Sequence, residues 1–500
     1  MKFDIPEAAP FIAGSIHRDS SAEIISLINP STQTEFAKYQ ATTKAGIDLA
    51  LNSAIDAQGL WMGLSVNGRV DVLEKFATLV NRDSDIIAYY DSISVGRPIR
   101  HTANECADLS SFVHHWAGLL RSGSIQRGDR FSVIPNHLTF TSREPLGIVA
   151  SIQPWNGPSA SFIEGVSPIL ACGNAALIKP SELSPLSALH MAKLMIESGA
   201  PPGLVNVLPG YGNIGARLIE LDPVKGVAFT GSVPTGRLVG ELAGKHLKKA
   251  TLELGGKSPN IVFADANLRE AAIGSLWGIF YNTGQLCCAG TRILVERSVA
   301  PAFIEELKKR AARIVVGDAL DLKTHMGPVA SAKQFATVNS YISNAKSNSA
   351  LFECGGNEDL QSLPMNGYFI SPTVLSNVSA DSPLVQEEIF GPVVSIIVFD
   401  NDEEALALAN NTKYGLAAKI WTTNINRMLS LAEKIEAGSI WGNSAWIGHP
   451  ALPFGGFKSS GIGSTNGIGS IEAFTQHKTV AIRHSQAIDD LPQWADISES

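Results

Sequence analysis

Residues 281–290 read YNTGQLCCAG, so Cys287 and Cys288 stand side by side in a small polar turn between glycines. Such a pair is a candidate for a metal site, a disulfide, buried packing or a covalent nucleophile. No CxxC or HxxxH spacing lies near it, which speaks against zinc. Adjacent cysteines rarely bridge each other because the geometry is strained. Packing and nucleophilic chemistry therefore remain.

Three further polar residues stand in apolar or glycine-rich settings: Asn156 in QPWNGP, Glu253 in LELGGKSPN and Glu388 in QEEIFGPV. A thiolate is the reactive form of cysteine, and positive or dipolar surroundings favour it. A buried carboxylate has a raised pKa and can act as a base near neutral pH. An asparagine amide can donate to an oxyanion. A cysteine, a glutamate and an asparagine together form a set for covalent acyl transfer.

The overall composition excludes several classes of protein. The 500 residues are 45% hydrophobic, and the net charge of -8 includes no long run of either sign, which gives no footprint for nucleic acid or an anionic membrane. The N-terminus lacks the apolar core of a secretory signal, and no stretch reaches the roughly 20 apolar residues of a membrane span. Five scattered cysteines fit a reducing compartment. We expect a cytoplasmic protein of two large domains, with no nucleic-acid or membrane partner.

Helical spacing dominates the N-terminal part of the chain, and strands join it later. Apolar periodicity predicts helices over 44–59 and 68–90. After these helices, short β-branched runs alternate with helices. One such helix has Ser184 as its cap, Pro185 in its first turn and Gly199 as its stop.

A second alternating series begins with a helix predicted over 267–285, directly before the cysteines. Residues 129–145 look like a β-hairpin that interrupts the first series. Alternation of this kind predicts an α/β fold with two doubly wound domains, each built on a parallel sheet.

Residues 210–215 read GYGNIG, which follows a strand and precedes a helix, as a dinucleotide-binding turn would. The acid expected about 20 residues further on is missing, because that stretch reads VAFTGS. A better phosphate candidate is FTGSVPTG, in which Gly231 and Ser232 precede a helix.

The segment IKPSE places Lys179 and Glu182 at the end of another predicted strand. A carboxylate there would accept hydrogen bonds from both ribose hydroxyls and would repel a 2′-phosphate, so it would favour NAD over NADP. The alternative is that Glu182 only caps the following helix.

Seven segments occur in the order found in one known family. They are QPWNGP, IKPSELSPLSAL, FTGSVPTGR, LELGGKSPNIVFADAN, NTGQLCCAGTR, EEIFGPV and LPFGGFKSSGIG. Together they resemble the motifs of the aldehyde dehydrogenase superfamily, and the resemblance extends from about residue 10 to 485. LELGGKSPN and GQxC at this separation are highly specific.

The resemblance implies a role for each matching residue. Cys287 matches the nucleophile, Glu253 the general base and Asn156 the oxyanion donor, while Cys288 is a neighbour that the chemistry does not require. The implied cofactor is NAD, and Glu182 disfavours NADP. The residues that match cofactor contacts are Trp155, Lys179, Glu182, Gly212, Gly231, Ser232, Leu254, Glu388 and Phe390.

The resemblance also implies a domain plan and an assembly. An NAD-binding domain would cover 1–122 and 144–253, and a catalytic domain 254–440. An oligomerisation arm would combine 123–143 with 471–490, and residues 441–470 would return to the cofactor domain. The arm implies a homodimer or a homotetramer.

Some positions depart from the family pattern. Gly157 stands where many hydrolytic members have an aromatic residue, and Glu164 and Gly165 replace a Trp-Lys pair. Gly157 and Ser161 are both small, and together they predict a wider substrate tunnel that contains Glu164. Ser464 replaces an arginine near the C-terminus, so contacts between subunits are expected to differ.

Aromatic and acidic residues supply the predicted tunnel mouth. The aromatic ones predict a bulky apolar or aromatic aldehyde, and the acids Asp108 and Glu164 leave an aminoaldehyde as the alternative. The predicted mouth residues are Asp108, Phe112, His115, Trp116, Trp446, Ile447, His449 and Phe454.

The predicted reaction is NAD-dependent oxidation of an aldehyde to an acid, with a thioester on Cys287 that Glu253 hydrolyses. A CoA-acylating member is the runner-up, and the presence of Glu253 speaks against it. A non-catalytic relative is disfavoured by the intact Cys287, Glu253 and Asn156. A Cys–His hydrolase is disfavoured because none of these motifs contains a histidine.

Overall fold

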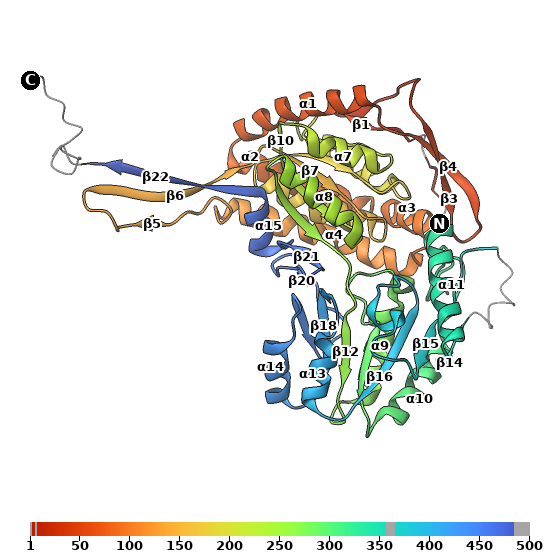
Figure 1. The fold of residues 1–500 in the computed structure, drawn as a ribbon. Coiled ribbons are helices and arrows are strands. Elements are labelled where there is room, and N and C mark those ends of the chain that lie inside the picture. Colours follow the sequence, from red (N-terminus) through yellow and green to blue (C-terminus); the bar gives the residue numbers. More distant parts are fainter. Residues whose placement is uncertain (1–2, 6–7, 357–365, 485–500) are drawn as a thin grey trace, which may run out of the picture.

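The computed structural model describes residues 3–5, 8–356 and 366–484. Two parallel-stranded sheets, each with helices packed on it, form the body of the molecule, and a long β arm extends from it (Figure 1). The predicted arm segment 471–490 therefore lies partly outside the described residues. So do small parts of the two predicted domains.

The first sheet has eight strands in the order β2-β1-β9-β8-β7-β10-β11-β21. Strands β9, β8, β7, β10 and β11 are parallel, whereas β21, from near the C-terminus, pairs antiparallel with β11. The strands are β1 Phe11–Ile12, β2 Ser15–Ile16, β7 Ile148–Ile152, β8 Ala175–Lys179, β9 Val205–Val207, β10 Val224–Thr230, β11 Lys249–Glu253 and β21 Gly461–Ile462.

Helices surround this sheet, and the core between them contains fully buried Trp61 and Trp116. The chain runs through α1 Lys44–Gly63, α2 Val66–Arg82, α3 Ser84–Val95, α4 Ile99–Arg121, α5 Pro158–Ala171, α6 Leu186–Glu197, α7 Gly212–Glu220, α8 Val233–Lys245 and α15 Gly467–Phe474.

Two expected helix features are wrong. The helix predicted over 68–90 is two helices, separated at Asp83, whose carboxylate pairs with Arg82 and His190. Apolar spacing continues across the break, so periodicity alone did not reveal it. The predicted Ser184 cap is also absent, because α6 begins after Pro185 and the Ser184 hydroxyl has no hydrogen-bond partner among the described residues.

The second sheet has seven strands in the order β14-β15-β16-β13-β12-β18-β19, all parallel except for the edge strand β14. Its strands are β12 Pro259–Val262, β13 Arg292–Glu296, β14 Leu351–Cys354, β15 Thr373–Ser376, β16 Val393–Phe399, β18 Ala417–Trp421 and β19 Ser439–Gly442. Its helices are α9 Leu268–Phe280, α10 Ala300–Ala311, α11 Ala332–Ser347, α12 Pro383–Gln386, α13 Asp402–Asn410 and α14 Ile425–Lys434. These sheets confirm the predicted α/β fold.

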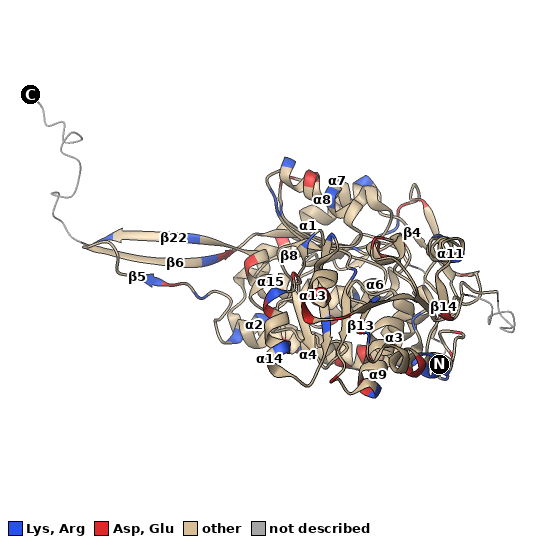
Figure 2. Cartoon of the chain, turned by 60° about the horizontal axis from the view of Figure 1, so that its bottom comes forward, with Lys and Arg blue, Asp and Glu red and all other residues tan. Residues whose placement is uncertain are grey.

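The arm is a three-stranded antiparallel sheet in the order β22-β6-β5, with strands β5 Arg130–Phe131, β6 His137–Pro145 and β22 Thr475–Arg483. The predicted hairpin is thus confirmed. Figures 1 and 2 both show the arm projecting from the body. Two small antiparallel ribbons complete the fold, β3 Ile24–Asn29 with β4 Thr34–Gln40 and β17 Tyr414–Gly415 with β20 Phe457–Lys458.

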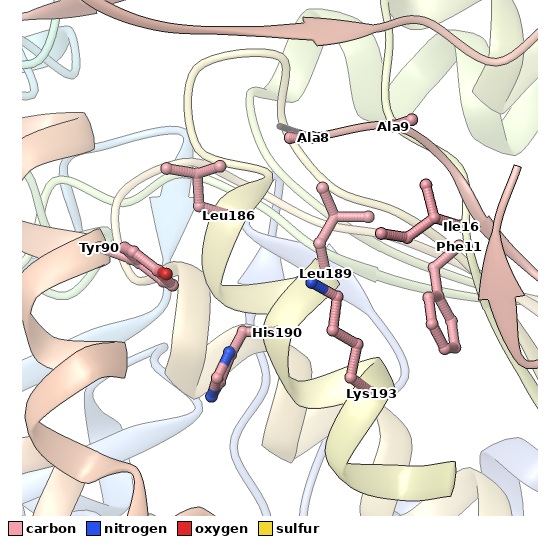
Figure 3. A pocket seen from close by; sticks show the side chains of 9 residues that line it. All are labelled: Ala8, Ala9, Phe11, Ile16, Tyr90, Leu186, Leu189, His190 and Lys193. Carbon is pink, nitrogen blue, oxygen red and sulfur yellow. The ribbon is translucent and has the colours of Figure 1, made fainter. Parts of the chain in front are cut away.

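Charges of both signs are scattered over the chain (Figure 2). Among the described residues, no helix is both long and apolar enough to cross a membrane. A cavity of about 20 Å³ lies beside the N-terminal segment and is far too small for an aldehyde and a dinucleotide. Figure 3 shows the side chains that line it. It is lined by Ala8, Ala9, Phe11, Ile16, Tyr90, Leu186, Leu189, His190 and Lys193.

Candidate active site

The helix before the cysteines ends at Phe280, earlier than the sequence predicts, and the chain turns sharply to present Cys287. Asn282 and the residue after it have left-handed backbone angles, with φ of 51° and 58°. Such angles are unfavourable for residues with side chains, so surrounding contacts must hold them. The Gln285 side chain does so, since its Nε2 donates to the Asn282 carbonyl at 3.1 Å and its Oε1 accepts from the Ala330 N–H at 2.9 Å.

Asn156 leaves the end of β7 and reaches this turn from the other sheet. Its Nδ2 donates to the Gln285 carbonyl at 3.0 Å, and its own carbonyl accepts from Asn282 Nδ2 at 2.8 Å. An amide nitrogen carries two N–H groups, so one is left for a further acceptor. The structure therefore brings together Asn156 and the cysteine turn, which lie far apart in sequence.

Glu253 is the last residue of β11 and is only 5% exposed. Neither oxygen of its carboxylate has a full hydrogen bond to a described residue. Burial raises the pKa of Glu253 well above its usual range, and the charge of Glu164 raises it further, while the Thr465 backbone N–H, which donates to the Phe454 carbonyl at 2.7 Å, partly opposes the rise. A carboxylate of this kind has the properties of a general base near neutral pH.

All five cysteines carry free thiols, and Cys287 is partly exposed whereas Cys288 is buried. A hydrogen bond between the two thiols and burial raise the pKa of Cys287, and the charges of Cys288, Glu388 and Glu253 add to the rise. The nucleophile candidate and the base candidate therefore lie close enough to influence each other.

The predicted cofactor residues of the first sheet gather at the carboxyl ends of its parallel strands. Lys179 ends β8 with its Nζ 3.7 Å from Glu182 Oε2, and Gly231 follows β10 with its N–H bonded to the Glu253 carbonyl at 3.0 Å. Ser232 caps α8 by accepting from the backbone N–H at position 235. Strand order reverses between β7 and β10, and ligands of such sheets bind outside that point.

Two other predicted cofactor residues meet from opposite sheets. The ring of Trp155 packs edge-on against Phe390, with centroids 5.3 Å apart. Phe390 has a left-handed φ of 55°, and its carbonyl accepts from Gln334 Nε2 at 2.8 Å.

Glu388, another predicted cofactor residue, accepts a hydrogen bond from the Gly256 N–H at 3.2 Å, and burial raises the pKa of Glu388 to about 7.

Leu254 and Gly212 are the remaining predicted cofactor residues. Leu254 is buried, and its side chain occupies the space that a Cβ on Gly236 of α8 would take. Gly212 is the exposed first residue of α7. Beside it, an open hollow of about 410 Å³ is lined by Thr42, Lys44, Ile47, Asn213, Ile214 and Arg217.

The predicted tunnel residues lie at the start of α5: Gly157 is its N-cap, and Ser161 and Glu164 follow at helical spacing on one face. A Cβ placed on Gly157 would approach only the Cβ of Ala160, at 3.9 Å, and Arg97 Nη1, at 4.0 Å. Burial raises the pKa of Glu164 to about 7, and the charge of Glu105 adds to the rise.

Aromatic side chains that sequence reasoning missed lie beside the predicted mouth. Trp277 has its ring centroid 5.5 Å from Tyr281 and 6.3 Å from Trp446, and it is 45% exposed. The sequence offered one signal for it: Trp277 lies four residues before Tyr281, so a helix before the cysteines places the two rings on one side. Phe454 and Cys287 both pack against one small buried cluster that includes Cys288.

Acids and a buried arginine close to Gly157 were also missed. Arg97 is 2% exposed and pairs with Glu105 and, at 3.6 Å, with Asp91. Of the predicted mouth residues, His115 and His449 come together, with their rings 5.9 Å apart. Within the described residues, no group of three or more His, Cys, Asp or Glu side chains is arranged to hold a metal ion.

Comparisons with known proteins agree with this geometry. A model of the aldehyde dehydrogenase family matches residues 16–480. A betaine aldehyde dehydrogenase of Brucella anthropi is 38% identical over 479 residues, which cover 95% of this chain and 97% of that relative.

Solved structures agree as well. An NAD+ complex of a Bacillus cereus aldehyde dehydrogenase is 35% identical, with a TM-score of 0.91 over 96% of this chain and 97% of that one. A mutant indole-3-acetaldehyde dehydrogenase of P. syringae, solved with NAD+ and IAA, is 35% identical, with a TM-score of 0.92 over 95% of this chain and 97% of that one. The chain belongs to the aldehyde dehydrogenase family and is an oxidoreductase that acts on the aldehyde group.

Proposed function

We propose that this enzyme oxidises an aldehyde to a carboxylic acid with NAD+, through a thioester on Cys287 that water cleaves with Glu253 as base. The observation that carries the proposal is the buried Glu253 carboxylate, which has no full hydrogen bond to a described residue and whose charge helps to raise the pKa of Cys287. Burial of a carboxylate without a partner costs free energy, so a group of this kind is a candidate for a function such as proton transfer.

The residues around the switch point between β7 and β10 fit a dinucleotide. Glu388 uses one carboxylate oxygen for the Gly256 N–H, which leaves acceptor capacity for a ribose hydroxyl. Gly231 and Ser232 present the N-terminus of the 13-residue helix α8, which favours a phosphate. When bound, NAD+ supplies the electron acceptor for the oxidation.

The protein's own residues would perform the remaining steps. The sulfur of Cys287 attacks the carbonyl carbon, and the free N–H of Asn156 and the Cys287 backbone N–H stabilise the oxyanion. One such donor is typically worth about 10²–10³ in rate. After oxidation, Glu253 takes a proton from water, the resulting hydroxide attacks the thioester, and the carboxylic acid leaves as the carbon–sulfur bond breaks. Glu253 then returns its proton, which restores the thiol.

We propose NAD rather than NADP because Glu182 lies where the adenosine ribose is expected. Its carboxylate is about 39% exposed and 3.7 Å from Lys179 Nζ, so it remains available as an acceptor. Glu182→Gln is expected to lower the preference for NAD over NADP roughly tenfold, because a nearby charge repulsion worth about 1–2 kcal/mol is removed.

Steady-state kinetics with each cofactor would measure this preference. Glu220→Gln, an exposed acid on α7 paired with Arg217, is the matched control and should leave the ratio unchanged. An unaltered ratio in Glu182→Gln would refute the role.

We place an aminoaldehyde first among substrates, which reverses the order expected from the sequence. The wall beside Gly157 holds Glu164 and Glu105, and aromatic rings at positions 277, 281 and 446 lie near the mouth. Carboxylates and aromatic faces both attract an ammonium group. The name of the Brucella relative fits this choice, whereas the aromatic rings alone support a bulky aromatic aldehyde as the second candidate.

Glu164→Gln tests the substrate class. Because its pKa of about 7 lies above the usual range, Glu164 gains its charge as pH rises through about 7. The ratio of kcat/KM for a trimethylammonium aldehyde to that for a neutral aldehyde of similar size should therefore rise over this pH range. In Glu164→Gln this ratio should fall about tenfold and lose its pH dependence. A ratio that does not change would contradict cation recognition.

The reaction class is tested by NADH absorbance with a panel of aldehydes, with and without CoA. Turnover without CoA and release of the free acid support the proposal. Turnover that requires CoA would favour the acylating reaction.

We further propose an NAD-binding domain of residues 1–122 and 144–253, a catalytic domain of residues 254–440, and an oligomerisation arm of 123–143 and 471–490, with 441–470 returning to the cofactor domain. We also propose a cytoplasmic location and a homodimer or homotetramer. The assembly is supported by the arm, whose exposed residues include Phe131, Val133, Ile134 and Ile482. Its strand β22 is an edge strand of the three-stranded arm sheet, and an unpaired edge is suited to pairing with another copy.

A further inference from the structure

Lys419 is a buried cation directly beneath the cysteine turn. It lies on β18, between β12 and β19 in the second sheet, and is 1% exposed. Its Nζ donates to the Cys288 carbonyl at 2.9 Å and lies 5.6 Å from the centre of the Trp441 ring. These contacts fix the ammonium group against the residue that adjoins the nucleophile.

Two glycines make room for this side chain. A Cβ on Gly278 of α9 would lie 3.3 Å from Lys419 Cε and 3.4 Å from its Nζ, and a Cβ on Gly290, just after the turn, would lie 3.0 Å from Nζ. A Cβ at either position would require the end of the lysine side chain to shift by a few tenths of an ångström. Glycine at both positions therefore leaves the Lys419 side chain its space beside the cysteine turn.

The charge of Lys419 has no carboxylate partner among the ion pairs of the described residues. A buried ammonium is costly unless an opposite charge compensates it. Burial lowers the pKa of Lys419 to about 8, and the two groups whose charges oppose this fall are Cys288 and Cys287. The thiols are thus the acidic groups that this cation faces.

Cys287 otherwise faces negative charge. Glu388 and Glu253 both raise its pKa, and each lies in the same site. Lys257, which is also buried, faces Arg292 and Glu388 rather than the thiols. The hydrogen bond with Cys287 lowers the pKa of Cys288, and the charge of Lys419 lowers it further. A thiolate at this turn therefore depends on Lys419 for compensation.

We propose that Lys419 is the counter-ion of a single negative charge shared by the thiols of Cys287 and Cys288, and that it positions and activates the nucleophile. When the Cys287 sulfur forms its bond to the carbonyl carbon, the one proton of the pair stays on Cys288. The proposal rests on Cys287 being the nucleophile. It gives Cys288 a role that the sequence did not suggest.

The test is the pH dependence of carbamidomethylation by iodoacetamide, followed by mass spectrometry at Cys287 in the intact enzyme. Because the two thiols share one charge, alkylation of Cys287 should follow the first ionisation of the pair, and the pKa of Cys288 is lowered to about 7. The native midpoint should therefore lie below the ordinary thiol value of 9.0. In Lys419→Met, which keeps the length of the side chain without its charge, the midpoint should rise by at least about one unit, so that alkylation near neutral pH slows roughly tenfold. NAD+ binding should stay the same.

Lys248→Met is the matched control, because Lys248 Nζ also donates to backbone carbonyls, those of Leu221 and Val224, but Lys248 lies just before β11 of the first sheet. Its midpoint should equal that of the native enzyme. An alkylation midpoint equal to the native one in a folded Lys419→Met variant would overturn the proposal. A midpoint at or above 9.0 in the native enzyme would also overturn it, and that measurement needs no variant. If Cys287→Ser loses oxidation but the alkylation midpoint of Lys419→Met equals the native one, the proposed function stands and only the role of Lys419 is refuted.

Discussion

Replacement of Cys287 by serine should reduce aldehyde oxidation at least about 10³-fold while NAD+ binding persists. A serine hydroxyl has nearly the same size, so the contacts of Gln285 that hold the turn should survive. Its much higher pKa removes the anionic nucleophile, and loss of a nucleophile typically costs several orders of magnitude in rate. NADH absorbance would measure turnover, and quenching of tryptophan fluorescence would measure cofactor binding.

The same change at Cys354 provides the control. Cys354 lies on β14, at the edge of the second sheet away from the turn, so Cys354→Ser should keep native turnover. Near-native oxidation in Cys287→Ser would refute the proposed mechanism.

The second large effect is expected for Glu253→Gln, which removes the proposed base but preserves side-chain shape. Oxidation needs no base for water, so a burst of NADH of about one per active site should precede slow turnover. General bases typically contribute about 10²–10⁴-fold, and the steady-state rate should fall by a factor in this range. Rapid-mixing measurements of NADH would resolve the two phases.

The pH profile gives a second readout of the same variant. The pKa of Glu253 is raised, so its carboxylate becomes available as pH rises through that value. Native steady-state turnover should climb with pH over this range, and the climb should vanish in Glu253→Gln. Glu241→Gln, at an exposed position of α8, is the control. An unchanged steady-state rate in Glu253→Gln would refute the base role.

Local patterns predicted much of the fold because helices and parallel strands leave periodic signals. The arm hairpin and both parallel sheets followed from such signals. The helix break at Asp83 did not follow from such a signal, because the residues on both sides continue the same apolar spacing. The Asp83 carboxylate pairs with His190 of another helix, a contact that forms only in the folded chain.

The helix before the cysteines shows the same limit. Its apolar residues continue to the turn, yet α9 ends at Phe280. The left-handed Asn282 is held by Gln285, whose amide is anchored in turn at Ala330, 45 residues later. Tertiary contacts of this kind override local preference, and no pattern within the turn reveals them.

By itself, the sequence determined which groups could perform chemistry: the thiol of Cys287, the carboxylate of Glu253 and the amide of Asn156, each within a specific motif. Only the tertiary structure decided their surroundings. It joined Asn156 to the turn through Gln285, buried Glu253, and placed Lys419 beneath the cysteines. The physical reason is that reactivity depends on burial and on neighbouring charge, and both arise from segments that meet only when the chain folds.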